Sequence, residues 1–144
     1  MNPTKLGKRI LYSRIELLEN NIIELEKMRV QSELEPDLFQ KKTNEWSLRY
    51  GLLESIQIVI DISCHIVGKY NLGNPNSYGN CVELLVKFNY IEESLGKNIR
   101  SMIKLRNLLA HEYALIDVNK LTSYLSLLGD FRNFIRSVSE YVKE

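Results

Sequence analysis

Apolar residues that recur every three to four positions along almost the whole chain constrain its fold most. In residues 6–34, for example, Ile15, Leu18, Ile22 and Leu25 keep this spacing with charged residues between them, which is typical of an amphipathic helix. The period-two alternation of a β-strand appears nowhere. Only seven Gly and three Pro interrupt 144 residues, so the sequence predicts an all-α fold.

Turn and capping signals divide this pattern into segments. Pro36 ends the first helix, Ser77 and Asp117 are plausible N-caps, and the residues around 71–76 have turn composition. The predicted helices cover residues 6–34, 37–70 (with a possible interruption near 42–44), 78–88, 92–113 and 118–142. The second half of the second helix is the most apolar part of the chain, which predicts a central position. We expect one domain over residues 1–144, an antiparallel bundle of about five helices.

Charge and apolar runs limit the classes of function. The formal net charge of +1 argues against a generally basic nucleic-acid-binding surface, although a local basic face can still bind phosphate. Residues 1–9 lack the apolar core of a secretory signal. No apolar run approaches the roughly 20 residues that span a bilayer. We therefore expect a soluble, cytoplasmic protein without a membrane partner.

The two cysteines, Cys64 and Cys81, form no CxxC pair, and no His stands at zinc-ligand spacing from them. Neither a metal site nor a disulfide framework is indicated. Both lie in apolar runs, so we expect reduced, buried thiols.

Residues 105–113 place polar side chains inside an apolar helical run. Arg106 falls near the middle of the apolar stripe, and it cannot lose its proton to become neutral. It is expected to face a cleft, a carboxylate or a second subunit. His111 lies about 140° away on a regular helix, so either the helix deforms after Ala110 or two copies of the segment meet. The alternative is structural: Arg106 forms a salt bridge, His111 is a surface residue and Tyr113 belongs to the core.

Glu54, Asp61 and His65 share a narrow polar face of the second helix. Asp61 is the first carboxylate to consider as a partner of Arg106. Alternatively, Asp61 and His65 satisfy each other at i, i+4. On the fourth helix, Lys97, Arg100 and Lys104 form a row that leads to His111. This row could bind an RNA backbone, or it is an ordinary solvated face.

Arg106, His111 and Tyr113 match the Arg-x4-His-x-Tyr motif of HEPN domain toxins, and the chain resembles the HepT family of toxin–antitoxin pairs. Residues 49–57, 61–66 and 77–78 extend the resemblance, although residues 79–81 and the long first helix depart from the family pattern. The resemblance implies a homodimer in which two motifs face one cleft. It also implies a metal-independent endoribonuclease, without a cofactor, that acts as the toxin of a type VII HepT/MntA system. Its partner would be an MntA-like nucleotidyltransferase antitoxin that transfers AMP to Tyr113.

The implied chemistry suits these side chains. Metal-free cleavage of RNA needs a base, an acid and positive charge near the phosphorus. The imidazole of His111 can be base or acid, and Arg106 offers a cationic fork for phosphate oxygens. Asn107 could orient the substrate or His111, and AMP on Tyr113 would block RNA. The competing hypothesis is a non-catalytic module that binds a nucleotide or serves only as a protein partner of a nucleotidyltransferase.

Overall fold

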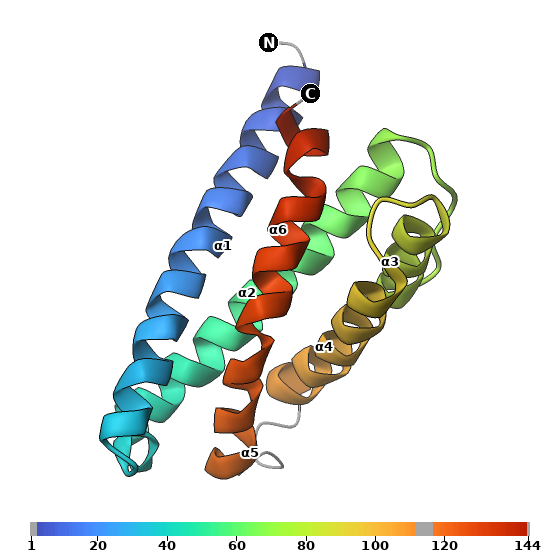
Figure 1. Cartoon of the computed structure of the whole chain (residues 1–144). Helices are drawn as coiled ribbons and strands as arrows, with labels where there is room; N and C mark the ends of the chain where they lie inside the picture. The colour runs from blue at the N-terminus through green and yellow to red at the C-terminus, as the bar shows by residue number, and fades with distance from the viewer. Residues whose placement is uncertain (1–2, 112–116, 144) are drawn as a thin grey trace.

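The computed structural model describes residues 3–111 and 117–143, and within these ranges it contains helices but no strand. The all-α prediction is therefore confirmed (Figure 1). In chain order the elements are α1 (Pro3–Leu34), the 3₁₀ helix η1 (Leu38–Gln40), α2 (Lys42–Lys69), α3 (Tyr78–Lys87), α4 (Glu93–His111), α5 (Val118–Ser123), the 3₁₀ helix η2 (Tyr124–Leu127) and α6 (Leu128–Lys143).

Helix α2 forms the centre of the bundle, as its apolar sequence predicts. It contacts α1, α3, α4, α5 and α6, and Leu52, Ile56, Val59 and Ile62 on it are fully buried. Helices α1 and α6 run side by side on one side of α2, and α3 and α4 pair on the other (Figure 1). Of the polar residues of α2 discussed below, Gln57 contacts α4 and Glu54 contacts α1.

By length and composition, α2 could also cross a membrane, which the expectation from the sequence overlooked. However, 56% of its most apolar window is buried inside the protein. The other helices thus provide the apolar environment that its sequence requires, as in the core helix of a soluble domain.

The possible interruption of the second helix near residues 42–44 is confirmed, one residue earlier: η1 and an extended Lys41 come before α2, which begins at Lys42. The last helix does begin after the N-cap Asp117, whose carboxylate accepts the Lys120 N–H at 2.9 Å, but it is broken by η2. Thr122 and Ser123 hydrogen-bond back to backbone carbonyls at this break, and such bonds compete with regular helix.

Both α2 and α3 end on an asparagine in the left-handed region, Asn71 with φ 54° and Asn89 with φ 64°. At the end of α2, the Leu72 N–H donates to the Val67 carbonyl and the Asn71 N–H to Gly68. The same pair of bonds follows α3. These are Schellman motifs; the first ends α2 and turns the chain back toward α3, and the second ends α3 before α4.

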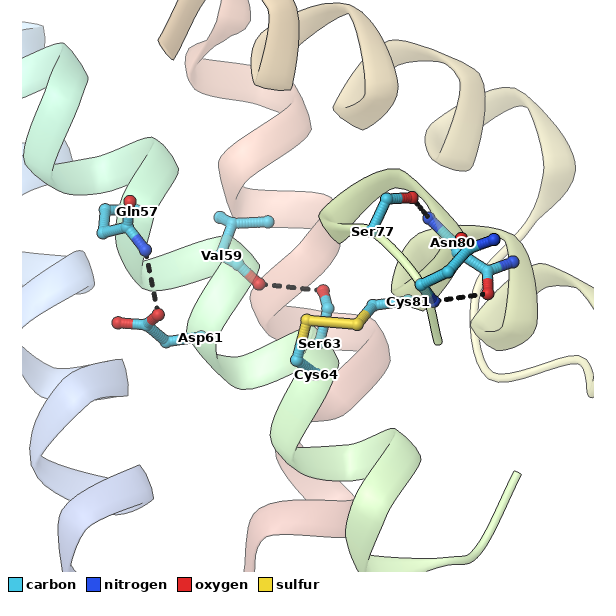
Figure 2. Close-up of a disulfide and its surroundings, with 9 residues drawn as sticks. Gln57, Val59, Asp61, Ser63, Cys64, Ser77, Asn80 and Cys81 are labelled. Carbon is cyan, nitrogen blue, oxygen red and sulfur yellow. Dashed lines mark hydrogen bonds between the residues drawn. A yellow bond between two sulfur atoms is a disulfide. The ribbon is translucent and has the colours of Figure 1, made fainter. Parts of the chain in front are cut away.

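A disulfide joins Cys64 on α2 to Cys81 on α3 (Figure 2). The prediction of two free thiols was wrong. The 17-residue separation in sequence gave no sign of pairing, but the reversal between α2 and α3 brings the two Cα atoms to 5.1 Å, a distance that disulfides span.

Reduction of this disulfide is expected to lower the free energy of unfolding by up to about 3 kcal/mol, because the unfolded chain then loses a closed loop. The measurement is the urea midpoint with and without a dithiol reductant. The double variant Cys64→Ser, Cys81→Ser serves as control and should not respond to the reductant. Equal midpoints for the wild type, at a confirmed content of two free thiols, would contradict the expectation.

Helices α3 and α4 approach closely at Gly96. A Cβ atom at this position would lie 2.4 Å from Cγ2 of Val86, and Val is stiff at χ1. Gly96→Ala is therefore expected to destabilise the protein by about 1–3 kcal/mol, measured by chemical denaturation. Gly129→Ala is the matched control: nothing lies within 4 Å of its Cβ position in α6, and the change should be neutral or stabilising. A stable Gly96→Ala variant would show that the two helices can separate freely.

Candidate active site

Arg106 is held in a fixed orientation by neutral groups. Its Nε donates to Oε1 of Gln57 on α2 at 3.0 Å, and its Nη1 donates to Oδ1 of Asn107 at 3.1 Å. Its Cζ lies 5.9 Å from the centroid of the Tyr78 ring at the start of α3. The side chain thus leaves the apolar stripe of α4 and reaches the junction of three helices, half-buried.

The carboxylate of Asp61 does not pair with Arg106, so that expectation was wrong. Gln57 lies between them: its Nε2 donates to Oδ1 of Asp61 at 2.9 Å (Figure 2), while its Oε1 accepts from Arg106. Asp61 therefore fixes which way the amide of Gln57 faces. It supports Arg106 through Gln57 rather than by direct contact.

The positive charge of Arg106 consequently has no anionic counterpart in the part of the chain that the structure describes. Amide oxygens and an aromatic ring satisfy the geometry of the guanidinium, but none of them carries a full negative charge. An arginine that is oriented in this way and not neutralised is suited to bind a phosphate.

Asp61 and His65 do not satisfy each other either, so that alternative was also wrong. The carboxylate of Asp61 accepts from Gln57, and His65 is partly buried one turn further along α2. Glu54, at the other end of the polar face, accepts from Asn21 of α1 at 2.9 Å and from the Tyr50 hydroxyl at 2.7 Å. The three residues of the polar face therefore have different surroundings, and of the three only Asp61 is connected to Arg106, through Gln57.

Burial lowers the pKa of His65 below its usual 6.5, and the positive charges of Lys69 and Arg14 lower it further. The unfolded chain therefore binds this proton more readily than the folded chain. The free energy of unfolding should therefore lose the contribution of His65 as the pH decreases below about 6.5. The test compares urea midpoints at about pH 7.5 and 5.5. His65→Gln should show a smaller difference, and an unchanged difference would rule out His65 as the cause.

His111 is the last residue of α4 and is exposed. The helix remains regular up to this position, so no distortion before His111 turns it toward Arg106. The deformation after Ala110, one of the two geometric alternatives, is therefore not found within α4, and the meeting of two copies of the segment stays a prediction. Residues 112–116, which include Tyr113, lie outside the described residues.

Lys97, Arg100 and Lys104 lie exposed on one face of α4. Arg100 forms an ion pair of 3.2 Å with Glu83 of α3, whereas Lys97 and Lys104 form none with the described residues. The row leads toward His111 by its helical spacing. It is a solvated face with two unpaired lysines.

An open surface cavity of about 600 Å³ lies at Asn107, the residue that follows Arg106. It lies between the start of α3, the loop before it and α4. Its lining includes Tyr78, Asn107, Asn76, Ile103 and both cysteines of the disulfide. Asn107, exposed on α4, therefore connects the guanidinium to the cavity.

Two residues of this site were not identified from the sequence. Gln57 stands one helical turn before Asp61, so the i, i+4 spacing could have suggested it as a neighbour of the carboxylate. Tyr78 follows the N-cap Ser77, whose Oγ accepts the Asn80 N–H at 3.0 Å (Figure 2). Nothing in the sequence shows that this helix start packs against Arg106. In residues 3–111 and 117–143, no three His, Cys, Asp or Glu side chains are grouped as metal ligands.

The family model described as Ribonuclease HepT-like matches residues 18–138. The mRNA nuclease HepT of Shewanella oneidensis is 31% identical over 97 residues, which cover 67% of this chain and 73% of that protein. The tRNA nuclease HepT of Aphanizomenon flos-aquae is 27% identical over 141 residues, which cover 96% and 94% of the two chains.

Solved structures share the fold. A tri-AMPylated HEPN toxin of Shewanella oneidensis, in complex with an MNT antitoxin, aligns with a TM-score of 0.79 at 25% identity, over 97% of this chain and 99% of that chain. YutE of Bacillus subtilis, a cytosolic protein of unknown function, aligns with a TM-score of 0.80 at 17% identity, over 94% and 90%. The latter similarity concerns the fold alone.

Proposed function

The chain belongs to the family of HepT-like ribonucleases, and from this premise we propose that it is the toxin of a type VII HepT/MntA toxin–antitoxin system that cleaves RNA without a metal ion. The observation that carries the proposal is the half-buried guanidinium of Arg106, which neutral groups orient without neutralising its charge. The names of the curated relatives, an mRNA nuclease and a tRNA nuclease, support RNA as the substrate class.

The proposed reaction uses the 2′-hydroxyl of the substrate as nucleophile. A base removes its proton, the 2′-oxygen attacks the phosphorus, and the 5′-oxygen leaves with a proton from an acid. The products are a 2′,3′-cyclic phosphate and a 5′-hydroxyl. His111 is the proposed proton carrier. Arg106 binds the nonbridging oxygens, where negative charge increases in the transition state, and Asn107 positions Arg106 through its side-chain oxygen.

The test is incubation of the purified protein with RNA in EDTA. We expect fragments that carry 2′,3′-cyclic phosphate and 5′-hydroxyl ends. Intact RNA after prolonged incubation with the unmodified protein, together with measurable nucleotide binding, would favour the non-catalytic module instead. Fragments that form only after addition of a divalent cation would contradict the metal-independent reaction.

We further propose that the active site is shared between the two subunits of a homodimer. Arg106 points into the junction of α2, α3 and α4, whereas His111 is exposed at the end of α4, so one protomer keeps them on different faces of a regular helix. In a symmetric dimer each motif can complete the other.

Mixed dimers test this arrangement. A mixture of Arg106→Ala chains with His111→Ala chains should regain activity, up to about a quarter of the wild-type level if subunits pair at random and the shared cleft contains two independent Arg106–His111 pairs. Mixtures that remain as inactive as the separate variants, although exchange of subunits is confirmed, would contradict the pairing of Arg106 with His111 of the partner.

The antitoxin is proposed to be an MntA-like nucleotidyltransferase that transfers AMP from ATP to Tyr113, with release of pyrophosphate. The complex of an AMPylated HEPN toxin with an MNT antitoxin among the similar structures supports this. The measurement is the intact mass of the protein made with and without an MntA-like nucleotidyltransferase. One or more added AMP units on Tyr113 are expected; an unchanged mass, or modification only at other residues, would contradict it.

We propose that both proteins act in the cytoplasm, where a disulfide is typically redox-active rather than permanent.

A further inference from the structure

We propose that the cavity between α3 and α4 is a subsite for one unpaired nucleobase of the RNA, and that Tyr78 is the residue on which this base stacks. The inference rests on the proposed function, because it takes the phosphate at Arg106 as the neighbour of that base. It adds a specificity-determining residue outside the Arg-x4-His-x-Tyr motif.

The cavity lies next to the residue that would bind the phosphate. Asn107 lines it and also accepts the hydrogen bond from Nη1 of Arg106. Tyr78 lines it too, and its ring centroid lies 5.9 Å from the guanidinium carbon. A phosphate bound to Arg106 would therefore place the adjacent nucleotide at the opening of this cavity.

The lining of the cavity combines apolar residues with two asparagines. Ile103 and the disulfide give the cavity an apolar wall, while the side chains of Asn76 and Asn107 bring amide groups to it. An apolar cavity of about 600 Å³ with a few polar groups is typical of a small-molecule site. Carboxamides can donate to and accept from the edge of a base, and no carboxylate lines the cavity to repel RNA.

Tyr78 offers an exposed aromatic ring at this cavity. Its side chain is 47% exposed, so the core does not account for an aromatic residue at this place. Unpaired RNA bases are commonly recognised by stacking on such rings, with hydrogen bonds to their edges. Arg106 lies over one face of the ring, so the base would stack on the other face, and the guanidinium adds positive charge for the backbone. The subsite accordingly requires single-stranded RNA.

The test separates base stacking from mere support of Arg106. It uses a series of single-stranded oligonucleotides of one sequence, in which one nucleotide at a time lacks its base. Each has a 2′-deoxy residue at the cleavage position, or at every position if no cleavage occurs, so that binding is measured without reaction. For the wild type, removal of the base at one position is expected to weaken binding by about tenfold to a hundredfold.

In Tyr78→Ala, binding of the complete oligonucleotide should weaken by a similar factor, and removal of that base should have no further effect. Tyr78→Phe keeps the ring and should behave like the wild type. Phe88→Ala is the matched control, because Phe88 is 45% exposed at the opposite end of α3 and lines no part of the cavity.

Two results would overturn the inference. One is a Tyr78→Ala variant that binds the complete oligonucleotide as the wild type does. The other is a loss in Tyr78→Ala that adds to the loss from base removal at every position, which would mean that the ring acts only through Arg106. Failure of the proposed function would appear differently, as uncleaved ribo-oligonucleotides with the wild type, and the binding series would still decide whether the cavity holds a base.

Discussion

Arg106→Ala is expected to lower the rate of RNA cleavage by about 10²- to 10³-fold, the usual effect of removing one group that stabilises charge in a transition state. The residue has no carboxylate partner among the described residues, so its positive charge is available to the phosphate. Arg106→Lys should also lose most of the activity, because an ammonium group cannot bind Gln57, Asn107 and the phosphate together in the planar geometry of a guanidinium. The measurement is the single-turnover rate on one RNA in EDTA.

Arg132→Ala provides the matched control. It removes the same charge from an exposed position on α6, where Arg132 pairs with Glu26 of α1 at 3.1 Å, and it should keep nearly full activity. If Arg132→Ala lost as much activity as Arg106→Ala, net charge rather than the oriented guanidinium would account for cleavage.

His111→Ala should lower the cleavage rate by about 10²- to 10⁴-fold, because a general acid or base contributes about this much. His111 is exposed at the end of α4, so the substitution should leave the free energy of unfolding almost unchanged. The activity and the unfolding midpoint are measured on the same preparation. A loss of activity without a loss of stability is the expected pair of results.

His65→Gln is the control for this variant, because the chain has only two histidines. His65 is partly buried in α2, so its substitution should change the pH dependence of stability and not the cleavage rate at neutral pH. If His111→Ala cleaved RNA normally while His65→Gln did not, the proton carrier would have to be sought on α2.

The local features of the fold could be predicted from the sequence. Helical periodicity located the helices, and the N-caps Ser77 and Asp117 follow from their side chains alone. The central position of α2 follows from its apolar composition. These properties depend on residues within one or two turns of each other, where spacing determines which side chains share a face.

The remaining features depend on contacts between helices. Cys64 pairs with Cys81 only because the chain reverses after Asn71. In the same way, α4 packs so that Gln57, rather than Asp61, meets the guanidinium of Arg106. The sequence showed that Arg106 needs a polar environment, since a buried guanidinium is costly without one. It could not show that the partner is a neutral amide, and this decides whether the charge remains available.

In the proposed mechanism Arg106 acts because amides orient it and no carboxylate neutralises it. The double variant Gln57→Glu, Asp61→Asn tests this most directly, since it exchanges the amide and the carboxylate without a change in net charge. The hydrogen bond between the two side chains can be retained, but the carboxylate then contacts Arg106. We predict a large loss of RNA affinity and cleavage at an unchanged unfolding midpoint, because an ion pair would compete with the phosphate. Wild-type affinity and cleavage in this variant would show that RNA binding does not depend on an Arg106 free of a carboxylate partner.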